Sequence, residues 1–129
     1  MKNGLAATSL LTEEETQLRE VARRFMDNEV AAATPAMEAS GQLDMTLMAS
    51  MGQLGLLGTF LPEAYGGSGA GIGTRAVVSE EMARVNAGLD VSVFADIILF
   101  ARAINDHGTE EQKRQYLPDI IAGRKLGAM

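Results

Sequence analysis

The chain has 129 residues, of which 47% are hydrophobic and 22% are charged. This length and balance predict one globular domain with a substantial core and exclude a disordered chain. The net charge is -6 and the basic residues are scattered, which excludes a basic surface for a nucleic-acid backbone. The sequence contains no cysteine, so disulfides, thiol nucleophiles and thiolate metal sites are excluded as well.

Neither a signal peptide nor a membrane span is expected. Residues 1 to 10 carry one positive charge and an interrupted apolar run, so we expect a flexible leader rather than a cleaved signal. The most apolar segment, residues 91 to 104, contains Asp96 and Arg102 and is shorter than the roughly 20 residues that cross a bilayer. These features and the lack of cysteine favour a cytoplasmic location.

The first predicted helix begins at a capping box, in which Thr12 and Glu15 each satisfy a backbone N–H group. Pro35 disfavours helix at the residue before it, so we expect this helix to end near Ala33 and a loop to occupy residues 38 to 43. Apolar residues recur at three- and four-residue steps and predict one buried stripe, made of Leu18, Val21, Ala22, Phe25, Met26 and Val30.

A glycine-rich connection separates two helical halves of the chain. Asp44 is expected to cap a second helix, which weakens at the first glycines that follow it. The stretch from Gly52 to Gly69 combines glycines with Pro62 and predicts a hinge on which the two halves fold together. Residues 74 to 86 then have apolar residues on one face and are expected to form an amphipathic third helix.

The fourth predicted helix spans residues 91 to 106, with Asp90 as its cap. Its residues are apolar on nearly every side, and such a helix must be enclosed all round. The other helices of so short a chain would struggle to enclose it. Part of its surface is therefore expected to face a partner domain or a ligand cavity.

The fifth predicted helix begins at a second capping box, formed by Thr109 and Gln112, and carries Tyr116 and Leu117 on its inner face. Residues 126 to 129 then look like the start of a β-strand. Together the elements predict an all-α fold, a bundle of five or six helices in an orthogonal or up-and-down arrangement.

The sequence offers no complete catalytic motif. The loop from Gly66 to Gly73 fits neither the dinucleotide-binding spacing nor the P-loop spacing, so a tightly turned connector is the better interpretation. Ser68 fails the nucleophile-elbow pattern because Ala70 stands where that pattern needs glycine. His107 is the sole histidine and lies at a predicted helix end, which favours a structural role and excludes a di-iron site. No catalytic, cofactor-binding or metal-binding residue is therefore predicted.

The paired carboxylates Glu80-Glu81 and Glu110-Glu111 are interpreted as solvated helix faces or ion-pair partners rather than as acid and base. Arg84 lies four residues after Glu80, the favourable order for an ion pair along a helix. We therefore expect these two residues to pair.

Three segments together resemble the N-terminal domain of the acyl-CoA dehydrogenase family of flavoenzymes, in their order and spacing as well as in their residues. They read Leu54-Gly55-Leu56-Leu57-Gly58 with Pro62-Glu63-Ala64-Tyr65-Gly66-Gly67, then Glu80-Glu81-Met82-Ala83-Arg84, then Gly108-Thr109-Glu110-Glu111-Gln112-Lys113 through Tyr116-Leu117-Pro118 to Gly123. The resemblance implies that residues 11 to 125 form the helical domain. It also implies that residues 126 to 129 begin a middle β-domain, which a C-terminal four-helix bundle follows.

Members of this family use FAD, held largely by the middle domain and a neighbouring subunit, and they introduce an α,β double bond into an acyl thioester. The resemblance therefore implies a homo-oligomeric enzyme acting on an acyl-CoA or acyl-carrier-protein thioester. The catalytic glutamate of the family would lie beyond Met129. The 129-residue chain alone is expected to be inactive.

The fourth helix resembles the one that lines the acyl-chain pocket in the family, which implies Val91, Ala95 and Leu99 as acyl contacts. Phe94 and Ile98 are equally good candidates for plain core, and the sequence alone does not separate the two stripes. A rival hypothesis needs no further domain. In it, the chain is a stand-alone, non-enzymatic helical module whose over-apolar fourth helix binds a partner.

Overall fold

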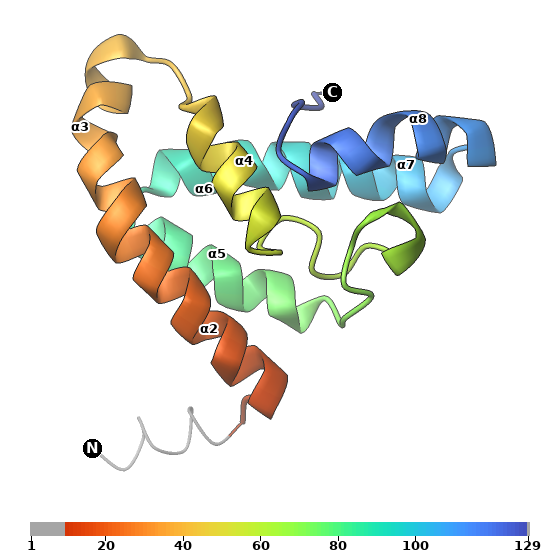
Figure 1. Cartoon of the computed structure of the whole chain (residues 1–129), viewed down its shortest axis with the longest axis horizontal. Helices are drawn as coiled ribbons and strands as arrows, with labels where there is room; N and C mark the ends of the chain where they lie inside the picture. The colour runs from red at the N-terminus through yellow and green to blue at the C-terminus, as the bar shows by residue number, and fades with distance from the viewer. Residues whose placement is uncertain (1–9, 129) are drawn as a thin grey trace.

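A computed structural model describes residues 10 to 128, so the predicted leader lies almost entirely outside the described residues. The described part is helical, which confirms the all-α prediction (Figure 1). Two helices each include a π-helical segment and still run without a break, so residues 10 to 128 contain five continuous helices and one single-turn 3-10 helix, η2. The elements are α2 (Glu13–Phe25), η1 (Met26–Val30), α3 (Ala31–Ser40), α4 (Met45–Gln53), η2 (Glu63–Tyr65), α5 (Gly73–Val85), α6 (Ala87–Phe94), η3 (Ala95–Ala101), α7 (Arg102–His107) and α8 (Glu110–Ile121).

The first helix starts as predicted but ends later. The Thr12 hydroxyl accepts the Glu15 N–H at 3.0 Å, which confirms the capping box. The predicted end near Ala33 is wrong, because α2, η1 and α3 run on through Pro35 as one rod. Pro35 lies on an exposed part of the helix, where water can satisfy the carbonyl that its missing N–H leaves unpaired. The rod ends instead at Gly41, whose φ of 65° is a left-handed conformation that suits glycine.

The stretch predicted to be a hinge packs tightly against the end of α8. Asp44 caps α4 as predicted, accepting the Thr46 N–H at 2.9 Å. At the far end of α4, a Cβ on Gly52 would lie 2.3 Å from the Ala122 carbonyl oxygen. A Cβ on Gly123 would likewise lie 2.0 Å from the Met48 carbonyl oxygen. The ends of α4 and α8 therefore touch backbone to backbone, an approach that only glycine permits.

The fourth helix begins earlier than predicted. Its cap is Asn86, whose side-chain oxygen accepts the Leu89 N–H at 2.9 Å, and the helix runs without a break through α6, η3 and α7. The prediction that Asp90 caps it is wrong. Asp90 lies in the first turn, and its carboxylate is bound by Arg75 and Ser79 of α5.

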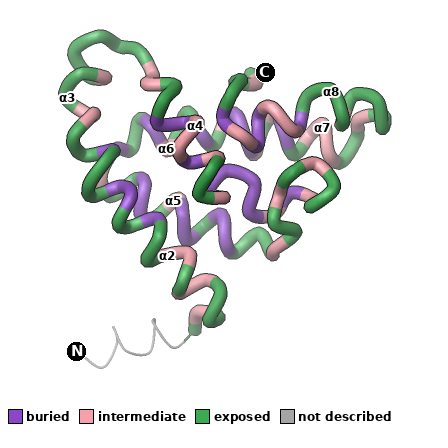
Figure 2. The backbone as a smooth tube through the Cα atoms, viewed as in Figure 1, coloured by how far each residue is buried: buried purple, intermediate pink, exposed green. Residues whose placement is uncertain are grey.

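Buried residues occur along each of the long helices except α3, and Figure 2 colours them purple along the backbone. The fourth helix contributes a buried stripe of Leu89, Val93, Ile97 and Ala101. Most of the stripe predicted on the first helix is buried, although Val21 is 37% exposed. Tyr116 was predicted to face inward but is 40% exposed. Its ring packs edge to face against the Phe100 ring, with 6.2 Å between the two ring centroids.

The C-terminal residues differ from the expected strand. Residues 126 to 128 have no regular secondary structure, and residues 10 to 128 contain no strand with which they could pair. The domain boundary near residue 125 stays a prediction. Within the described residues, no helix combines the length and the apolar character needed to cross a membrane.

Candidate functional site

The outer side of the fourth helix is apolar and open. Val91 is 66% exposed, and Phe94 and Leu99 are each 45% exposed. Ala95 and Ile98 lie between them and are half-buried. We call these five residues the outer stripe. The two candidate stripes of the sequence thus lie on one side of the helix, and neither Phe94 nor Ile98 belongs to the buried core.

Ordinary helical spacing accounts for this arrangement. The five residues stand at positions i, i+3, i+4, i+7 and i+8, and residues at these positions share one face of a helix. The part of the stripe from Ala95 onward lies in the π-helical segment η3.

A hollow of about 290 Å³ lies between α5 and the outer stripe. Its lining is mostly apolar but includes two arginines, and it consists of Ile72, Arg75, Ala76, Ser79, Phe94, Ile98 and Arg102. Arg75 donates from Nη2 to Asp90 Oδ1 at 3.0 Å, and the Ser79 hydroxyl donates to Asp90 Oδ2 at 2.7 Å. The Arg75 side chain is 5% exposed, so this ion pair is covered by protein.

Asp96 lies on the opposite, inner side of the fourth helix and is 1% exposed. Its Oδ1 accepts the Gly127 N–H at 2.6 Å, while its Oδ2 has no hydrogen-bond partner. Burial raises the pKa of Asp96 to about 6, against the lowering effect of the Gly127 N–H. A Cβ on Gly127 would lie 2.0 Å from Phe100 Cδ1, so the terminal segment sits directly on η3. An acidic residue within an apolar helix is the one signal of this contact in the sequence, and it does not identify Gly127 as the partner.

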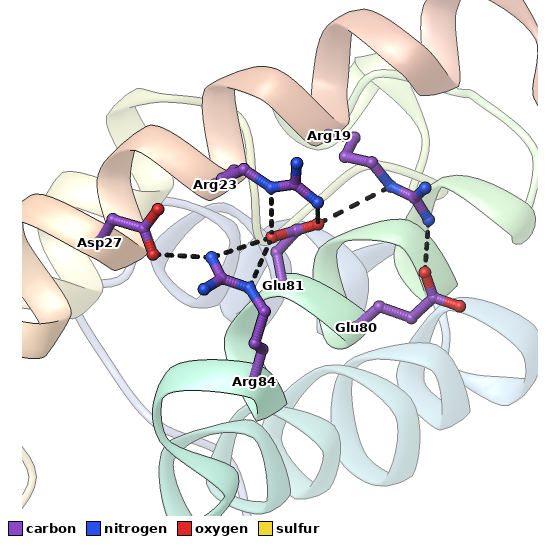
Figure 3. Close-up of polar contacts among 6 residues, drawn as sticks. All are labelled: Arg19, Arg23, Asp27, Glu80, Glu81 and Arg84. Atoms are coloured by element: carbon purple, nitrogen blue, oxygen red, sulfur yellow. Dashed lines mark hydrogen bonds and ion pairs between the residues drawn. The ribbon is translucent and has the colours of Figure 1, made fainter. Parts of the chain in front are cut away.

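A third polar cluster joins α2 to α5 around Glu81, which is 3% exposed (Figure 3). Arg23 donates to both carboxylate oxygens, at 2.8 and 3.1 Å, and Arg84 donates to one of them at 3.2 Å. Arg84 also binds Asp27 at 2.7 Å, whereas Glu80 is bound by Arg19. The predicted pair of Glu80 with Arg84 is therefore wrong, because the neighbouring helix supplies closer partners for both residues.

These arginines lower the pKa of Glu81. The hydrogen bond from Arg23 is the largest cause, and the bond from Arg84 adds to it, while burial acts in the opposite direction. Every member of the cluster has an opposite charge beside it. The cluster therefore joins two helices and is not poised for acid–base chemistry.

The glycine-rich loop is a poor cradle for a phosphate group. The N–H groups of Gly67, Ser68, Gly69 and Ala70 donate to the carbonyls of Pro62, Gly58, Leu61 and Thr59, at 2.9 to 3.0 Å. Phosphate binding by such a loop needs unpaired N–H groups. The loop is a turned connector, as predicted, and does not fit the diphosphate of FAD.

Other ligand-binding signals are sparse in the described residues. Within residues 10 to 128, no group of three or more His, Cys, Asp or Glu side chains could hold a metal ion. His107 is exposed in the last turn of α7, where the predicted helix end placed it.

Comparison with known proteins gives a consistent result. Residues 12 to 124 match the N-terminal domain of acyl-CoA dehydrogenases. The chain is 35% identical over 118 residues to a short-chain-specific acyl-CoA dehydrogenase of Clostridium acetobutylicum, covering 92% of this chain and 31% of that protein. It thus spans about three tenths of the length of this curated relative.

Two solved structures extend the likeness to the fold. The chain superposes on butyryl-CoA dehydrogenase from Megasphaera elsdenii with a TM-score of 0.80 and 29% identity, covering 90% of this chain and 31% of that one. It superposes on an acyl-CoA dehydrogenase from Bacillus anthracis, solved in complex with FAD, with a TM-score of 0.84 and 31% identity, covering 92% of this chain and 20% of that one. The sequence match, the five-helix architecture and the family segments agree, and the chain belongs to the acyl-CoA dehydrogenase family, whose N-terminal helical domain it contains.

Proposed function

We propose that this chain is the helical N-terminal domain of an FAD-dependent enzyme that introduces an α,β double bond into an acyl thioester. Its contribution is the wall against which the acyl chain lies, with Val91, Ala95 and Leu99 as contacts. The observation that carries the proposal is the outer stripe. Exposed apolar side chains gathered along one helix mark a surface that binds a ligand or another domain.

FAD, in this proposal, is bound by residues outside the described part of the chain. The glycine-rich loop supports this division, because its N–H groups are already paired. When bound, FAD would accept the hydride that leaves the β-carbon of the acyl group, while the family's catalytic glutamate, beyond Met129, would take the proton from the α-carbon. The helical domain would hold the apolar part of the substrate and keep water away from it.

The proposal is tested on the complete product of the reading frame that contains this sequence. The purified protein is expected to carry flavin absorbance, which acyl-CoA thioesters bleach in the absence of oxygen. A product that contains no flavin, or a flavin that no acyl-CoA or acyl-carrier-protein thioester bleaches, would contradict the proposal. Gel filtration of the same sample tests the proposed homo-oligomer, and fractionation of the source cells tests the proposed cytoplasmic location.

The outer stripe is tested by placing a charge on it. Val91→Glu or Leu99→Glu is expected to raise KM for acyl-CoA by about tenfold or more, because the acyl chain would then lie against an ionised group. Ser92→Glu is the matched control, since Ser92 is exposed on the same helix but lines a different hollow, together with Met37 and Leu43. Equal KM values for all three variants would show that the outer stripe does not contact the acyl chain.

The isolated 129-residue chain separates this proposal from the stand-alone binding module. As a domain of a larger enzyme, the chain is expected to show no acyl-CoA-dependent reduction of a dye. Its outer stripe would also promote self-association in the absence of the covering domains. A monomeric, cooperatively folding chain that captures a protein partner through Val91 and Leu99 would favour the binding module instead.

A further inference from the structure

Residues 124 to 128 follow α8 and are held by two acids; we call these residues the terminal segment. The Asp119 carboxylate of α8 is bound by Arg124 Nε at 2.9 Å. Farther along, Asp96 Oδ1 accepts the Gly127 N–H at 2.6 Å. The Arg124 side chain is 60% exposed, so water screens the first contact. Asp96 is 1% exposed, and its bond to Gly127 is therefore the one that protein shelters.

Side-chain packing contributes little to the position of the terminal segment. Leu126 and Ala128, on either side of Gly127, are exposed. A hollow of about 240 Å³ adjoins the segment and is lined on its other side by Phe100, Tyr116 and Ile120. Because close packing is what usually fixes a chain in place, a segment beside a hollow depends on its directional hydrogen bonds.

An acid is a costly residue at the position of Asp96. The buried stripe beside it on the fourth helix is apolar, as Val93 and Ile97 show. Within residues 10 to 128, the buried Oδ2 of Asp96 has no hydrogen-bond partner. An apolar side chain of the same shape would avoid this cost, but it could not accept the Gly127 N–H. A residue that breaks the local pattern in this way marks a position where a specific contact matters.

The segment η3 carries both Asp96 and part of the proposed acyl wall. Ala95 and Leu99 lie on the outer side of this seven-residue segment, and Asp96 lies on its inner side. A continuous helix keeps its residues at fixed separations, so whatever Asp96 holds stays at a set distance from the acyl contacts. In the proposed function, the residues that bind FAD follow the terminal segment.

We propose that Asp96 is a positioning residue, which fixes the terminal segment through the Gly127 N–H and so sets the flavin-binding part of the enzyme against the acyl wall. This inference rests on the proposed function and adds a residue to it. Asp96 touches neither the acyl chain nor the flavin. A misplacement of about 1 Å far from the chemistry can lower a rate roughly 100-fold, so the anchor affects the rate of hydride transfer more than the binding of the acyl chain.

The test uses the complete enzyme, supplied with FAD, and compares Asp96→Leu with Asp96→Asn. Leucine has the branched shape of aspartate but no acceptor, whereas asparagine keeps an oxygen for the Gly127 N–H. We expect the rate constant for flavin reduction by acyl-CoA, per bound flavin, to fall about tenfold or more in Asp96→Leu and less than about threefold in Asp96→Asn. The dissociation constant of acyl-CoA should change less than about twofold in both variants, because the outer stripe is intact.

The outcomes separate this inference from the proposed function. If the wild type and Asp96→Leu share one rate constant, or if the loss is confined to acyl-CoA binding, Asp96 is not a positioning residue and the proposed function stands. A wild-type flavin that no acyl thioester reduces would overturn both.

Hydrogen–deuterium exchange of the terminal segment gives a readout that does not depend on the flavin. In the complete protein, the amide of Gly127 is expected to exchange about fivefold faster or more in Asp96→Leu than in the wild type, because its acceptor is gone. Asp96→Asn should restore the slow exchange to within about threefold. Equal exchange in the wild type and Asp96→Leu would show that Asp96 does not hold the segment.

Val93→Ala is the control for general damage to the fourth helix, since Val93 is buried in the core of the same helix. It is expected to destabilise the domain and to leave the flavin reduction rate near that of the wild type. A loss as large as that of Asp96→Leu would overturn the inference. Should Asp96→Leu fail to fold, Gly127→Ala breaks the same bond from the donor side, because its Cβ would lie 2.0 Å from Phe100 Cδ1. A folded Gly127→Ala enzyme with the rate constant and exchange of the wild type would overturn the role of Asp96.

Discussion

Two buried carboxylates in this domain have opposite surroundings. Glu81 is 3% exposed and lies between arginines of two helices, whereas Asp96 is 1% exposed and accepts one N–H from Gly127. Their pKa values move in opposite directions, because Arg23 lowers that of Glu81 and burial raises that of Asp96 to about 6. Burial alone therefore does not set the ionisation of a carboxyl group. The supply of partners decides whether a buried acid stabilises the fold or weakens it at neutral pH.

The largest expected effect is the loss of Glu81. Glu81→Ala leaves Arg23 and Arg84 facing each other across the α2–α5 interface without their shared acid (Figure 3). Breaking a buried ion pair costs roughly 3 to 5 kcal/mol, and the side chains of these arginines are 56% and 46% exposed, which reduces the cost. We expect a loss of about 2 to 3 kcal/mol in the free energy of unfolding, measured by urea denaturation of the chain at pH 7.

The control for Glu81 is its neighbour Glu80. The Glu80 side chain is 67% exposed, so its ion pair with Arg19 is screened, and Glu80→Ala is expected to cost less than about 1 kcal/mol. The pKa of Glu81 is depressed, so its stabilisation is present above the ordinary value of 4.5 and is lost as the pH falls through the lower folded-state pKa. Equal effects of the two substitutions, or a Glu81 effect unchanged at pH 3, would contradict the role assigned to the arginines.

Asp96 is expected to show the opposite pH dependence. Its folded-state pKa of about 6 lies above the ordinary value of 3.8, so the stability linked to this group is fully present below 3.8 and is lost as the pH rises through 6. Asp96→Asn keeps an oxygen for the Gly127 N–H and removes the charge, although it places an unpaired amide where Oδ2 was. We expect the substitution to stabilise the chain by about 1 kcal/mol at pH 8 and to be neutral or destabilising at pH 4.

Thermal unfolding of the wild type and Asp96→Asn at both pH values measures this difference. Asp106→Asn serves as the control, because the Asp106 side chain lies on the same continuous helix and is 43% exposed. An Asp96→Asn effect that is the same at both pH values would show that the Asp96 carboxylate is not destabilised by burial.

Glu81 and Asp96 also show which contacts of this domain the sequence can predict and which it cannot. The capping boxes at Thr12 and Thr109 were predicted correctly because each is complete within four consecutive residues. Arg23, which donates to both oxygens of Glu81, lies 58 residues away on another helix, and Gly127 is separated from Asp96 by 31 residues. Local patterns carry no information about such contacts, since they depend on how the helices pack.

The fourth helix makes the same point at the candidate site. Asn86 and Asp90 are both residue types that cap helices well. Asn86 caps the fourth helix, whereas the Asp90 carboxylate is bound by Arg75 and Ser79 of another helix. The sequence placed the open apolar surface on the correct helix. It did not show which residues of that helix are exposed, because exposure depends on how the other helices pack against it.

The smallest expected effect on stability is that of Gly127→Ala, and it sharpens the comparison most. The added Cβ would lie 2.0 Å from Phe100 Cδ1, so the terminal segment must move away from η3 and the Gly127 N–H must leave Asp96. Because Leu126 and Ala128 beside it are exposed, we expect a change in stability of less than about 0.5 kcal/mol. If the helices alone keep the Asp96 carboxyl group buried, its pKa should nevertheless rise above 6, because the N–H that lowers it is gone. An NMR titration of the Asp96 side-chain carboxyl carbon measures this shift, and the double variant Gly127→Ala/Phe100→Leu should partly reverse it by restoring space. If the titration midpoint of Asp96 is unchanged in Gly127→Ala, the Gly127 N–H does not lower its pKa. The contrast drawn here between Asp96 and Glu81 would then be wrong about the partner of Asp96.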